Sequence, residues 1–310
     1  MSTSSYDQFH EPALLRESLE FLVTDLSGTY VDATFGGGGH TRELLSRLNP
    51  TARVIAFDVD EDSHRVANEL SLSDKRLFFV QKNFSQIKNV FENMNIKTAD
   101  GFMFDLGVSS YQIDSEPGFS YRRDEKLDMR LDKDLKISAY EIINSYDLDK
   151  LIEVFSKYGE EPRSRALAKA VLKRRQKNRI ETTFQLGEIV ARVCGKSAKN
   201  LSRIFQALRI EVNKELDSLS EGLEAAVALT VCGGRVVVIS YHSLEDRIVK
   251  EKFKYEAATC ICPPQTIICT CGKVARARIL TRKPILPSRD EINRNRRARS
   301  AKMRVIEKIV

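Results

Sequence analysis

Short apolar runs alternate with amphipathic stretches over the first hundred residues of the chain. Four of these runs, residues 30–33, 53–57, 77–80 and 101–104, are continuous enough to be buried strands, and the segments between them have helical periodicity. Strands that are buried on both faces and connected by helices form a parallel sheet covered on each side. The pattern therefore predicts an α/β fold with a doubly wound sheet, which binds ligands outside the carboxyl ends of its strands.

The strand pattern stops after Ser110 and returns near Ser218. Residues 111–136 are polar, and residues 137–213 have helical periodicity without a convincing strand, which predicts a small inserted helical domain. We place the two parts of the α/β domain at residues 1–112 and 215–310, and the helical insert at residues 113–214.

The second part of the α/β domain is expected to begin with a helix and to end with a strand. Ser218 and Glu221 have the spacing of a capping box at the start of that helix, which is expected to extend to Thr230. Gly233-Gly234 would stop it before a strand at residues 235–240. Residues 301–310 alternate apolar and charged side chains, which favours an antiparallel edge strand of the same, otherwise mostly parallel sheet.

The composition is typical of a globular protein without a membrane role. Hydrophobic residues make up 42% of the 310 residues and charged residues 30%, and no run of about 18 apolar residues could span a bilayer. Residues 1–11 lack the basic and apolar segments of a secretory signal. We therefore expect a cytoplasmic protein with reduced cysteines.

Positive charge is concentrated in two clusters. The formal net charge is +7, and residues 276–304 contribute eleven Lys or Arg against two Asp or Glu. A second cluster, residues 173–179, contains five basic residues and no acidic one. A solvated basic face is a common alternative for one such cluster, but two of them favour a nucleic acid as the partner.

The first apolar run leads directly into four glycines. Residues 31–40 have the sequence VDATFGGGGH, so that a strand ends near Asp32 and a helix begins near Thr41. Glycines at this point allow the backbone to approach a ligand closely. Such a turn occurs in nucleotide, dinucleotide and S-adenosylmethionine sites, and it can also be purely structural.

The end of the next strand indicates that the ligand contains a nucleoside. This strand ends in Asp58, whose carboxylate can accept hydrogen bonds from both hydroxyls of an unphosphorylated ribose. Thr41 or Arg42 stands where the dinucleotide pattern has its third glycine, which disfavours NAD and FAD without excluding them. No Gly-Lys-Ser or Gly-Lys-Thr follows, so a P-loop is excluded. S-adenosylmethionine fits best.

The fourth strand ends in Asp105, at the same predicted edge of the sheet. Here a transferred methyl group would meet its acceptor. Asp105 is also placed where an ordinary helix-capping carboxylate would be, and that alternative stays open.

Several motifs together resemble those of one family, the MraW-type bacterial 16S ribosomal RNA cytosine-N4 methyltransferases. The resemblance extends from about His10 to Ile309. Its motifs are FGGGGHT at 35–41, DLGVSS at 105–110, GFS at 118–120, LDMR at 127–130, YGEE at 158–161, ALRIEVN at 207–213 and SYHSLEDR at 240–247.

This resemblance implies a class I, Rossmann-like methyltransferase domain interrupted by a helical insert. It further implies S-adenosylmethionine as the cofactor, and as the substrate the N4 of a cytidine of 16S rRNA, in the decoding centre of the small ribosomal subunit. Naked rRNA, an assembled small subunit and a homodimer all remain open. By match to the family's cofactor site, the residues implied to contact S-adenosylmethionine are Gly38, Gly39, His40, Asp58, Phe84, Asp105 and Gln112.

The catalytic group is less well defined. The exocyclic amine of cytosine is a poor nucleophile, so we expect its orientation toward the methyl group to matter more than a strong base. Many amino-methyltransferases have Asp, Asn or Ser followed by Pro-Pro and an aromatic residue after the fourth strand, whereas this chain has Asp105-Leu106-Gly107. Asp105 is the candidate for orienting the cofactor, and the weaker candidates near the acceptor are Ser109, Asn213 and His242.

Some of these residues have plain structural alternatives. Phe84 would stack on adenine or pack in the core, and His242 would act near the acceptor or cap a helix. The target base must leave its stack, and residues 114–132 and the helical insert are expected to gate or read the RNA. A dinucleotide-dependent oxidoreductase and a non-catalytic RNA-binding protein are the competing function classes.

Four cysteines lie close together near the C-terminus. Cys260, Cys262, Cys269 and Cys271 could hold one zinc ion, but C-x-C pairs are tighter than the usual zinc-binding spacing. From the spacing we expect a loop of unliganded thiols and no metal.

Overall fold

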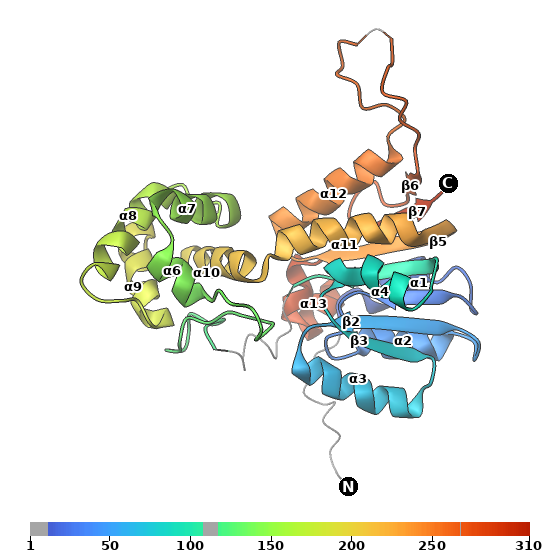
Figure 1. Cartoon of the computed structure of the whole chain (residues 1–310), viewed down its shortest axis with the longest axis horizontal. Helices are drawn as coiled ribbons and strands as arrows, with labels where there is room; N and C mark the ends of the chain where they lie inside the picture. Colours follow the sequence, from blue (N-terminus) through green and yellow to red (C-terminus); the bar gives the residue numbers. More distant parts are fainter. Residues whose placement is uncertain (1–11, 108–116, 267) are drawn as a thin grey trace. The chain divides into compact units, whose positions relative to one another are not determined.

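The computed structural model describes residues 12–107, 117–266 and 268–310, which fall into two compact units (Figure 1). The first, here called the sheet unit, is formed by residues 1–107 and 216–310, and the second, here called the helical unit, by residues 108–215. Within these described ranges no helix is both long enough and apolar enough to cross a membrane.

The sheet unit is built on a seven-stranded sheet with the order β3-β2-β1-β4-β5-β7-β6. The first five strands in this order are parallel, and β7 is antiparallel to both of its neighbours. This is the doubly wound, mostly parallel sheet that the sequence predicts. The strands are β1 (Thr29–Asp32), β2 (Arg53–Asp58), β3 (Leu77–Gln81), β4 (Ala99–Asp105), β5 (Thr230–Ser240), β6 (Ala277–Ile279) and β7 (Lys302–Lys308).

Successive side chains of the strands point to opposite faces, and each face has its own core. Val54 and Val237 pack in the cluster that includes residues of α1, α2 and α3, whereas their neighbours Ile55 and Val236 pack in the cluster of α4, α11 and α12. The helices are α1 (Leu15–Leu22), α2 (Gly39–Arg47), α3 (Glu61–Ser73), η2 (Phe84–Gln86), α4 (Ile87–Asn93), α11 (Glu215–Leu229), α12 (Ser243–Ala257), α13 (Arg289–Arg294) and η4 (Arg296–Ser300).

The last strand of the chain is antiparallel as predicted, but it does not form the edge. β7 pairs with β5 on one side and with the short strand β6 on the other, so that β6 is the edge strand. The sequence gives little signal for β6, because three residues are too few to establish a strand pattern.

α11 ends at Leu229, one residue before the predicted Thr230, but the capping box predicted at Ser218 and the role predicted for Gly233-Gly234 are wrong. The helix begins at Glu215, so Ser218 lies inside it and caps nothing, because the good helix formers before it extend the helix by a turn. Gly233 and Gly234 lie inside β5 instead of ending α11. A Cβ atom on Gly234 would be 2.6 Å from the Asp100 carbonyl oxygen, at an irregularity in the β4–β5 pairing. Gly234 thus allows the two strands to approach closely, whereas Gly233 has φ 83° and no atom near its Cβ position.

The helical unit has a core of its own. Leu127, Met129, Phe155, Leu167 and Leu208 are among its buried apolar residues. Four of its helices start at side-chain caps, which are Ser138, Asp147, Thr182 and Ser197, and Ser138 forms a capping box with Glu141. The helices are α6 (Ala139–Ser145), α7 (Leu148–Glu153), the π-helical turn η3 (Val154–Tyr158), α8 (Ser164–Arg175), α9 (Thr183–Cys194) and α10 (Ala198–Asn213).

Candidate functional site

The glycine-rich turn between β1 and α2 is held from within by Asp32. Its carboxylate is fully buried and accepts hydrogen bonds from the Thr34 N–H at 3.1 Å and from Thr41 Oγ1 at 2.6 Å. Burial raises the pKa of Asp32 to about 6, although both hydrogen bonds oppose the shift. One carboxylate therefore fixes both ends of the turn.

Asp58, at the end of β2, holds the middle of the same turn. Its Oδ2 accepts a hydrogen bond from the Gly36 N–H at 2.7 Å, and its Oδ1 accepts one from the Asp60 N–H at 3.1 Å. Burial raises the pKa of Asp58 against these hydrogen bonds. The Ser63 hydroxyl and the Val59 N–H also stabilise the ionised form of Asp58, so the two hydroxyls of a ribose would share its acceptor positions with these groups.

Two glycines of the turn have a backbone conformation that other residues rarely adopt. Gly36 has φ 52° and Gly38 has φ 76°. A Cβ atom on Gly36 would meet no described atom within 4 Å, so the backbone here borders open space, whereas one on Gly38 would lie 2.7 Å from the Phe35 ring. No side chain caps the start of α2 in the described structure. Its first amides are therefore suited to a carboxylate or phosphate.

Asp105, at the end of β4, is linked to the turn and to the segment after β5. Its N–H donates to Thr34 Oγ1 at 2.7 Å, and its Oδ1 accepts a hydrogen bond from the Tyr241 hydroxyl at 2.7 Å. Burial raises the pKa of Asp105 to about 7, and the nearby acids Asp32 and Glu245 add to the shift that Tyr241 opposes. A bound cation would therefore stabilise the ionised form of Asp105.

His40 lies in the first turn of α2, beside Asp105. Its Nδ1 is 3.7 Å from Asp105 Oδ2, but burial lowers the pKa of His40 to about 4, so the ring is neutral at neutral pH and the two do not form an ion pair. Among the described residues, nothing forms a hydrogen bond with the buried Nε2. A buried ring nitrogen without a partner commonly marks the place of a ligand or water.

Together these groups fit S-adenosylmethionine. Asp58 suits the ribose, the amides at the start of α2 suit the carboxylate of the amino-acid part, and the acidic surroundings of Asp105 suit its positive charges. The structure brings together, at the carboxyl edge of the sheet, five of the residues predicted to contact the cofactor: Gly38, Gly39, His40, Asp58 and Asp105.

The other predicted contacts differ. Phe84 is half-buried, with its ring at 86° to that of Phe104, and a Cβ on Gly222 of α11 would lie only 2.6 Å from it. These contacts give the ring a packing role, and stacking on adenine stays a prediction. Gln112 and Ser109 lie outside the described residues.

His242 and Asn213 have clear structural roles. His242 is the N-cap of α12, where Nδ1 accepts a hydrogen bond from the Glu245 N–H at 3.4 Å. Asn213 Oδ1 accepts from the Leu131 N–H at 2.8 Å, and its Nδ2 donates to the carbonyl oxygens of Met129 and Arg209. The amide of Asn213 is thus committed within the helical unit. His242 Nε2 is buried, lies 3.0 Å from Glu245 Oε1 and forms no hydrogen bond within the described residues, so a role of His242 near the acceptor stays a prediction.

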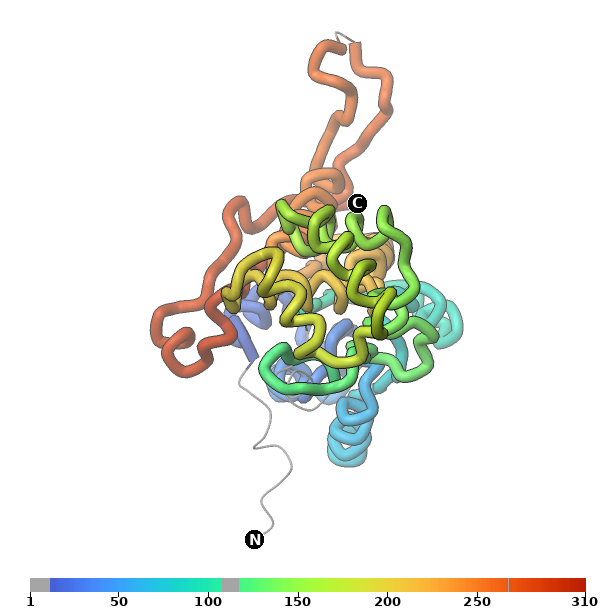
Figure 2. Tube along the Cα trace, turned by 90° about the vertical axis from the view of Figure 1, so that its left-hand side faces the viewer, coloured from blue at the N-terminus to red at the C-terminus, as the bar shows by residue number. Residues whose placement is uncertain are grey.

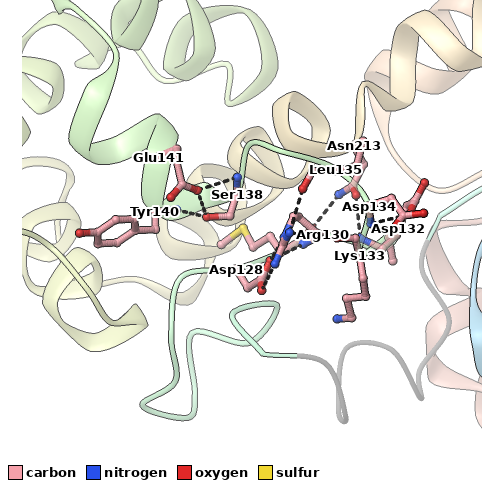
Figure 3. A network of polar contacts seen from close by, with 12 residues as sticks. Asp128, Arg130, Asp132, Lys133, Asp134, Leu135, Ser138, Tyr140, Glu141 and Asn213 are labelled. Carbon is pink, nitrogen blue, oxygen red and sulfur yellow. Dashed lines mark hydrogen bonds and ion pairs between the residues drawn. The ribbon is translucent and has the colours of Figure 1, made fainter.

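Asn213 belongs to a polar network that shapes the loop before α6 (Figure 3). Arg130 forms a two-fold contact with Asp128, at 2.6 and 3.0 Å, and also donates to the Leu135 carbonyl at 2.8 Å. Ser138 and Glu141 close the network at the start of α6. The loop of residues 127–138 is therefore a built feature of the helical unit.

Two motifs of the predicted family meet at this loop. Gly118 has φ 88°, and a Cβ atom there would lie 2.7 Å from both the Lys126 carbonyl oxygen and the Asp128 nitrogen. The Met129 N–H donates to the Pro117 carbonyl at 3.2 Å. The GFS and LDMR motifs thus form one packed structure, for which glycine at residue 118 is required.

Tyr241 and the two threonines of the turn are functional candidates that sequence reasoning missed. Tyr241 follows β5, next to β4 in the sheet, and its hydroxyl reaches Asp105. Thr34 and Thr41 hold Asp105 and Asp32 in place. An available signal was the position of Tyr241 at the carboxyl end of the strand that neighbours Asp105.

Most residues of the C-terminal basic cluster are exposed to solvent, and some of them form ion pairs. Arg276 pairs with Glu256, Arg278 with Glu307, and Arg304 with Asp246. The basic side chains between residues 279 and 300 are all exposed, namely Arg282, Lys283, Arg289, Arg294, Arg296, Arg297 and Arg299. We call this set the basic segment. A polyphosphate can reach its charges from the solvent.

The chain is similar to known proteins along almost its whole length. The family model described as the MraW methylase family matches residues 7–309. "Ribosomal RNA small subunit methyltransferase H" of Caldicellulosiruptor saccharolyticus is 44% identical over 304 residues, with 97% of this chain and 99% of that protein covered. The protein of the same name from Thermomicrobium roseum is 45% identical over 307 residues, with 97% and 94% covered. A solved rRNA methylase from Streptococcus thermophilus superposes with a TM-score of 0.42 at 12% identity, covering 96% of this chain and 94% of its own.

Proposed function

Since this chain belongs to the MraW methylase family, we propose that it is an S-adenosylmethionine-dependent methyltransferase of small-subunit ribosomal RNA. Its relatives at 44 and 45% identity are named as methyltransferases of small-subunit ribosomal RNA. The structural observation that carries the proposal is the convergence of Asp32, Asp58 and Asp105 around the glycine turn at the carboxyl edge of the sheet.

We further propose that the acceptor is N4 of a cytidine of 16S rRNA, in the decoding centre of the cytoplasmic small subunit. The support is the resemblance of motifs along the chain, including DLGVSS at 105–110 and SYHSLEDR at 240–247. An exocyclic amine requires a methyl donor held in line with it, and this requirement matches a site that has positioning groups but no buried strong base among its described residues.

Each residue of the site has a task in this proposal. When bound, S-adenosylmethionine supplies an electrophilic methyl group on a sulfonium. Asp58 binds the ribose hydroxyls, and the start of α2 binds the carboxylate. Asp105, held by Thr34 and Tyr241, attracts the positive charge of the cofactor in its ionised form.

Contact with RNA is assigned to the basic segment and to the helical insert, residues 113–214. The exposed cations of the basic segment supply the sequence-independent attraction to phosphates. In the second basic cluster Lys173 and Lys177 are exposed, whereas Arg175 donates to the Ile143 carbonyl and Arg179 to the Tyr140 hydroxyl. The loop of residues 127–138 and its helices are the proposed reader of the RNA structure around the target base, which must be unstacked for transfer.

A methyl-transfer assay tests the proposal. Tritiated S-adenosylmethionine is combined with the protein and with small subunits, naked 16S RNA or total protein from cells that lack this gene. We expect label in RNA, recovered as N4-methylcytidine after digestion to nucleosides. Label confined to protein, or label at another nucleoside, would contradict the proposed acceptor.

A further inference from the structure

The long loop between α12 and β6 carries four cysteines whose side chains gather at one point. Residues 258–276 contain no helix or strand among their described positions, and the loop runs away from both elements (Figures 1 and 2, orange). Loops longer than about 12–15 residues are uncommon unless they are functional or disordered. The four sulfurs, from Cys260, Cys262, Cys269 and Cys271, all lie within 4.8 Å of one another.

The spacing of the sulfurs is that of a single tetrahedral ion. Cys269 Sγ is 3.5 Å from the Sγ atoms of Cys260 and Cys271, and 3.9 Å from that of Cys262. Cys260 and Cys271 are also separated by 3.9 Å. Four thiolates at about 2.3 Å from one ion, at the corners of a tetrahedron, are about 3.8 Å apart. The observed distances thus bracket the value that a central ion requires.

The backbone around the sulfurs also points to thiolates. The Ile261 N–H donates to Cys271 Sγ at 3.4 Å, and the Cys262 N–H donates to Cys260 Sγ at 3.4 Å. Hydrogen bonds of this kind stabilise negatively charged sulfur and orient it, as the groups surrounding metal ligands do. The tight C-x-C spacing had favoured unliganded thiols, but two such pairs on facing arms of one loop supply four ligands in space.

We propose that Cys260, Cys262, Cys269 and Cys271 bind one zinc ion in a closed, structural site that joins the two arms of this loop. Four thiolates around one position are typical of zinc, and they leave no coordination position for a substrate or water. An iron–sulfur cluster spreads its cysteines further apart, because several metal and sulfide atoms lie between them.

A bound metal would explain how this exposed loop keeps an ordered structure. The four cysteines are exposed or half-exposed, and the apolar side chains of Ile261, Ile268 and Val274 are also exposed. A loop with so little buried surface gains no order from a hydrophobic core, so binding of a metal is what would hold its two arms together. The site lies outside the groups assigned to cofactor binding, and it stands independently of the proposed function.

Metal analysis of the full-length, untagged protein, purified without chelators, is the first test. We expect about one zinc per chain, and we expect the double variant Cys260→Ser with Cys269→Ser, which breaks both C-x-C pairs, to lose it. Cys232→Ser is the matched control, because Cys232 is an exposed cysteine outside the cluster, and it should retain the zinc. Metal-free protein, iron in place of zinc, or zinc retained by the double variant would each overturn the proposal.

Two measurements on the unmodified chain keep the test independent of variant folding. The four thiols should resist a thiol reagent until the zinc is chelated, while Cys232 reacts at once. Replacement of the zinc by cobalt should give the strong visible absorption of tetrahedral cobalt with thiolate ligands. Cluster thiols that react as readily as Cys232, or that are found joined as disulfides, would contradict a zinc site.

Discussion

Aspartates lie both at the glycine turn of the sheet unit and in the loop of residues 127–138 of the helical unit, but their pKa values are shifted in opposite directions. At the turn, burial raises the pKa of Asp32 to about 6 and that of Asp105 to about 7. In the loop, burial also acts to raise the pKa of Asp128, but the hydrogen bonds and the charge of Arg130 outweigh it and lower the pKa. Glu141 likewise has a lowered pKa, through its hydrogen bonds with Ser138.

The difference separates a ligand site from a structural network. Among the residues that the structure describes, the carboxylates at the turn are desolvated without a cationic partner, and the buried His40 Nε2 forms no hydrogen bond. The carboxylates of the loop are satisfied by neighbours in the same loop. Buried carboxylates with raised pKa values therefore indicate where a positively charged ligand binds, and carboxylates with cationic or hydrogen-bonding partners indicate where the chain stabilises its own structure.

The largest expected effect is on cofactor binding by Asp105→Asn. We expect the affinity for S-adenosylmethionine at pH 8 to fall by about 100-fold, because a charged interaction contributes about 2–3 kcal/mol. Ionising Asp105 costs folding free energy as the pH rises from its ordinary pKa of 3.8 to about 7. The variant avoids that cost, so its free energy of unfolding at pH 8 should equal or exceed that of the unmodified chain. Calorimetric binding and denaturant unfolding measure the two quantities, and unchanged affinity would rule out the assigned role.

We expect the opposite result for the same substitution in the loop, Asp128→Asn, which should lower stability and leave cofactor binding intact. It leaves Arg130 without its two-fold partner, so we expect the free energy of unfolding to fall by about 1–3 kcal/mol at pH 7, with cofactor affinity unchanged. Because the folded-state pKa of Asp128 is lowered, its contribution is present above its ordinary pKa and is lost as the pH falls through the lowered value. The stability difference from the unmodified chain should thus shrink in acid. A loss of cofactor affinity equal to that of Asp105→Asn would remove the contrast between the two regions.

Cofactor binding should also depend on pH. Protonation of Asp105 below its pKa of about 7 removes the charge that attracts the cofactor, so we expect the affinity to weaken by about tenfold between pH 8 and pH 6. Asp105→Asn should flatten this part of the profile. A titration series in buffers of constant ionic strength measures it, and a profile of equal slope in both proteins would assign the dependence to another group.

The smallest effect is expected for Tyr241→Phe. Loss of the hydroxyl removes a hydrogen bond that stabilises the ionised form of Asp105, so the pKa of Asp105 should rise further. We expect about fivefold weaker cofactor binding at pH 7, since one hydrogen bond to a charged group contributes about 1.5 kcal/mol or less in a partly exposed site. Binding should recover at pH 9, where Asp105 is ionised regardless. Persistent weakening at pH 9 would show that Tyr241 acts through packing instead.

The strands could be predicted from the sequence because their residues are mostly apolar. The predicted segments 53–57 and 77–80 differ from β2 and β3 by one residue each. The four middle residues of β2 are buried, whereas β3 lies at the edge of the sheet and only Leu77 in it is buried. One local signal was misleading, since Ser218 is a good cap by type but lies inside α11. Neighbouring helix formers and packing decided the helix start there.

The candidate site was readable only in part, because its geometry is tertiary. The glycine turn, Asp58 and Asp105 follow strands, so their common edge could be inferred from the topology. The hydrogen bond from Tyr241 to Asp105 joins residues far apart in the chain, and no local pattern encodes it. The arrangement of the four cysteines could not be predicted either, because spacing along the chain does not reveal that two C-x-C pairs face each other.

The most direct test of the central assignment uses cells that lack this gene. Their 16S rRNA is analysed by nucleoside mass spectrometry after complementation with the unmodified chain or with Asp105→Asn. We predict that the unmodified chain restores N4-methylated cytidine at one position of the decoding centre, and that the folded Asp105→Asn variant, expressed at the same level, leaves it strongly reduced. Full restoration by both proteins, or no N4-methylcytidine with the unmodified chain, would contradict the account.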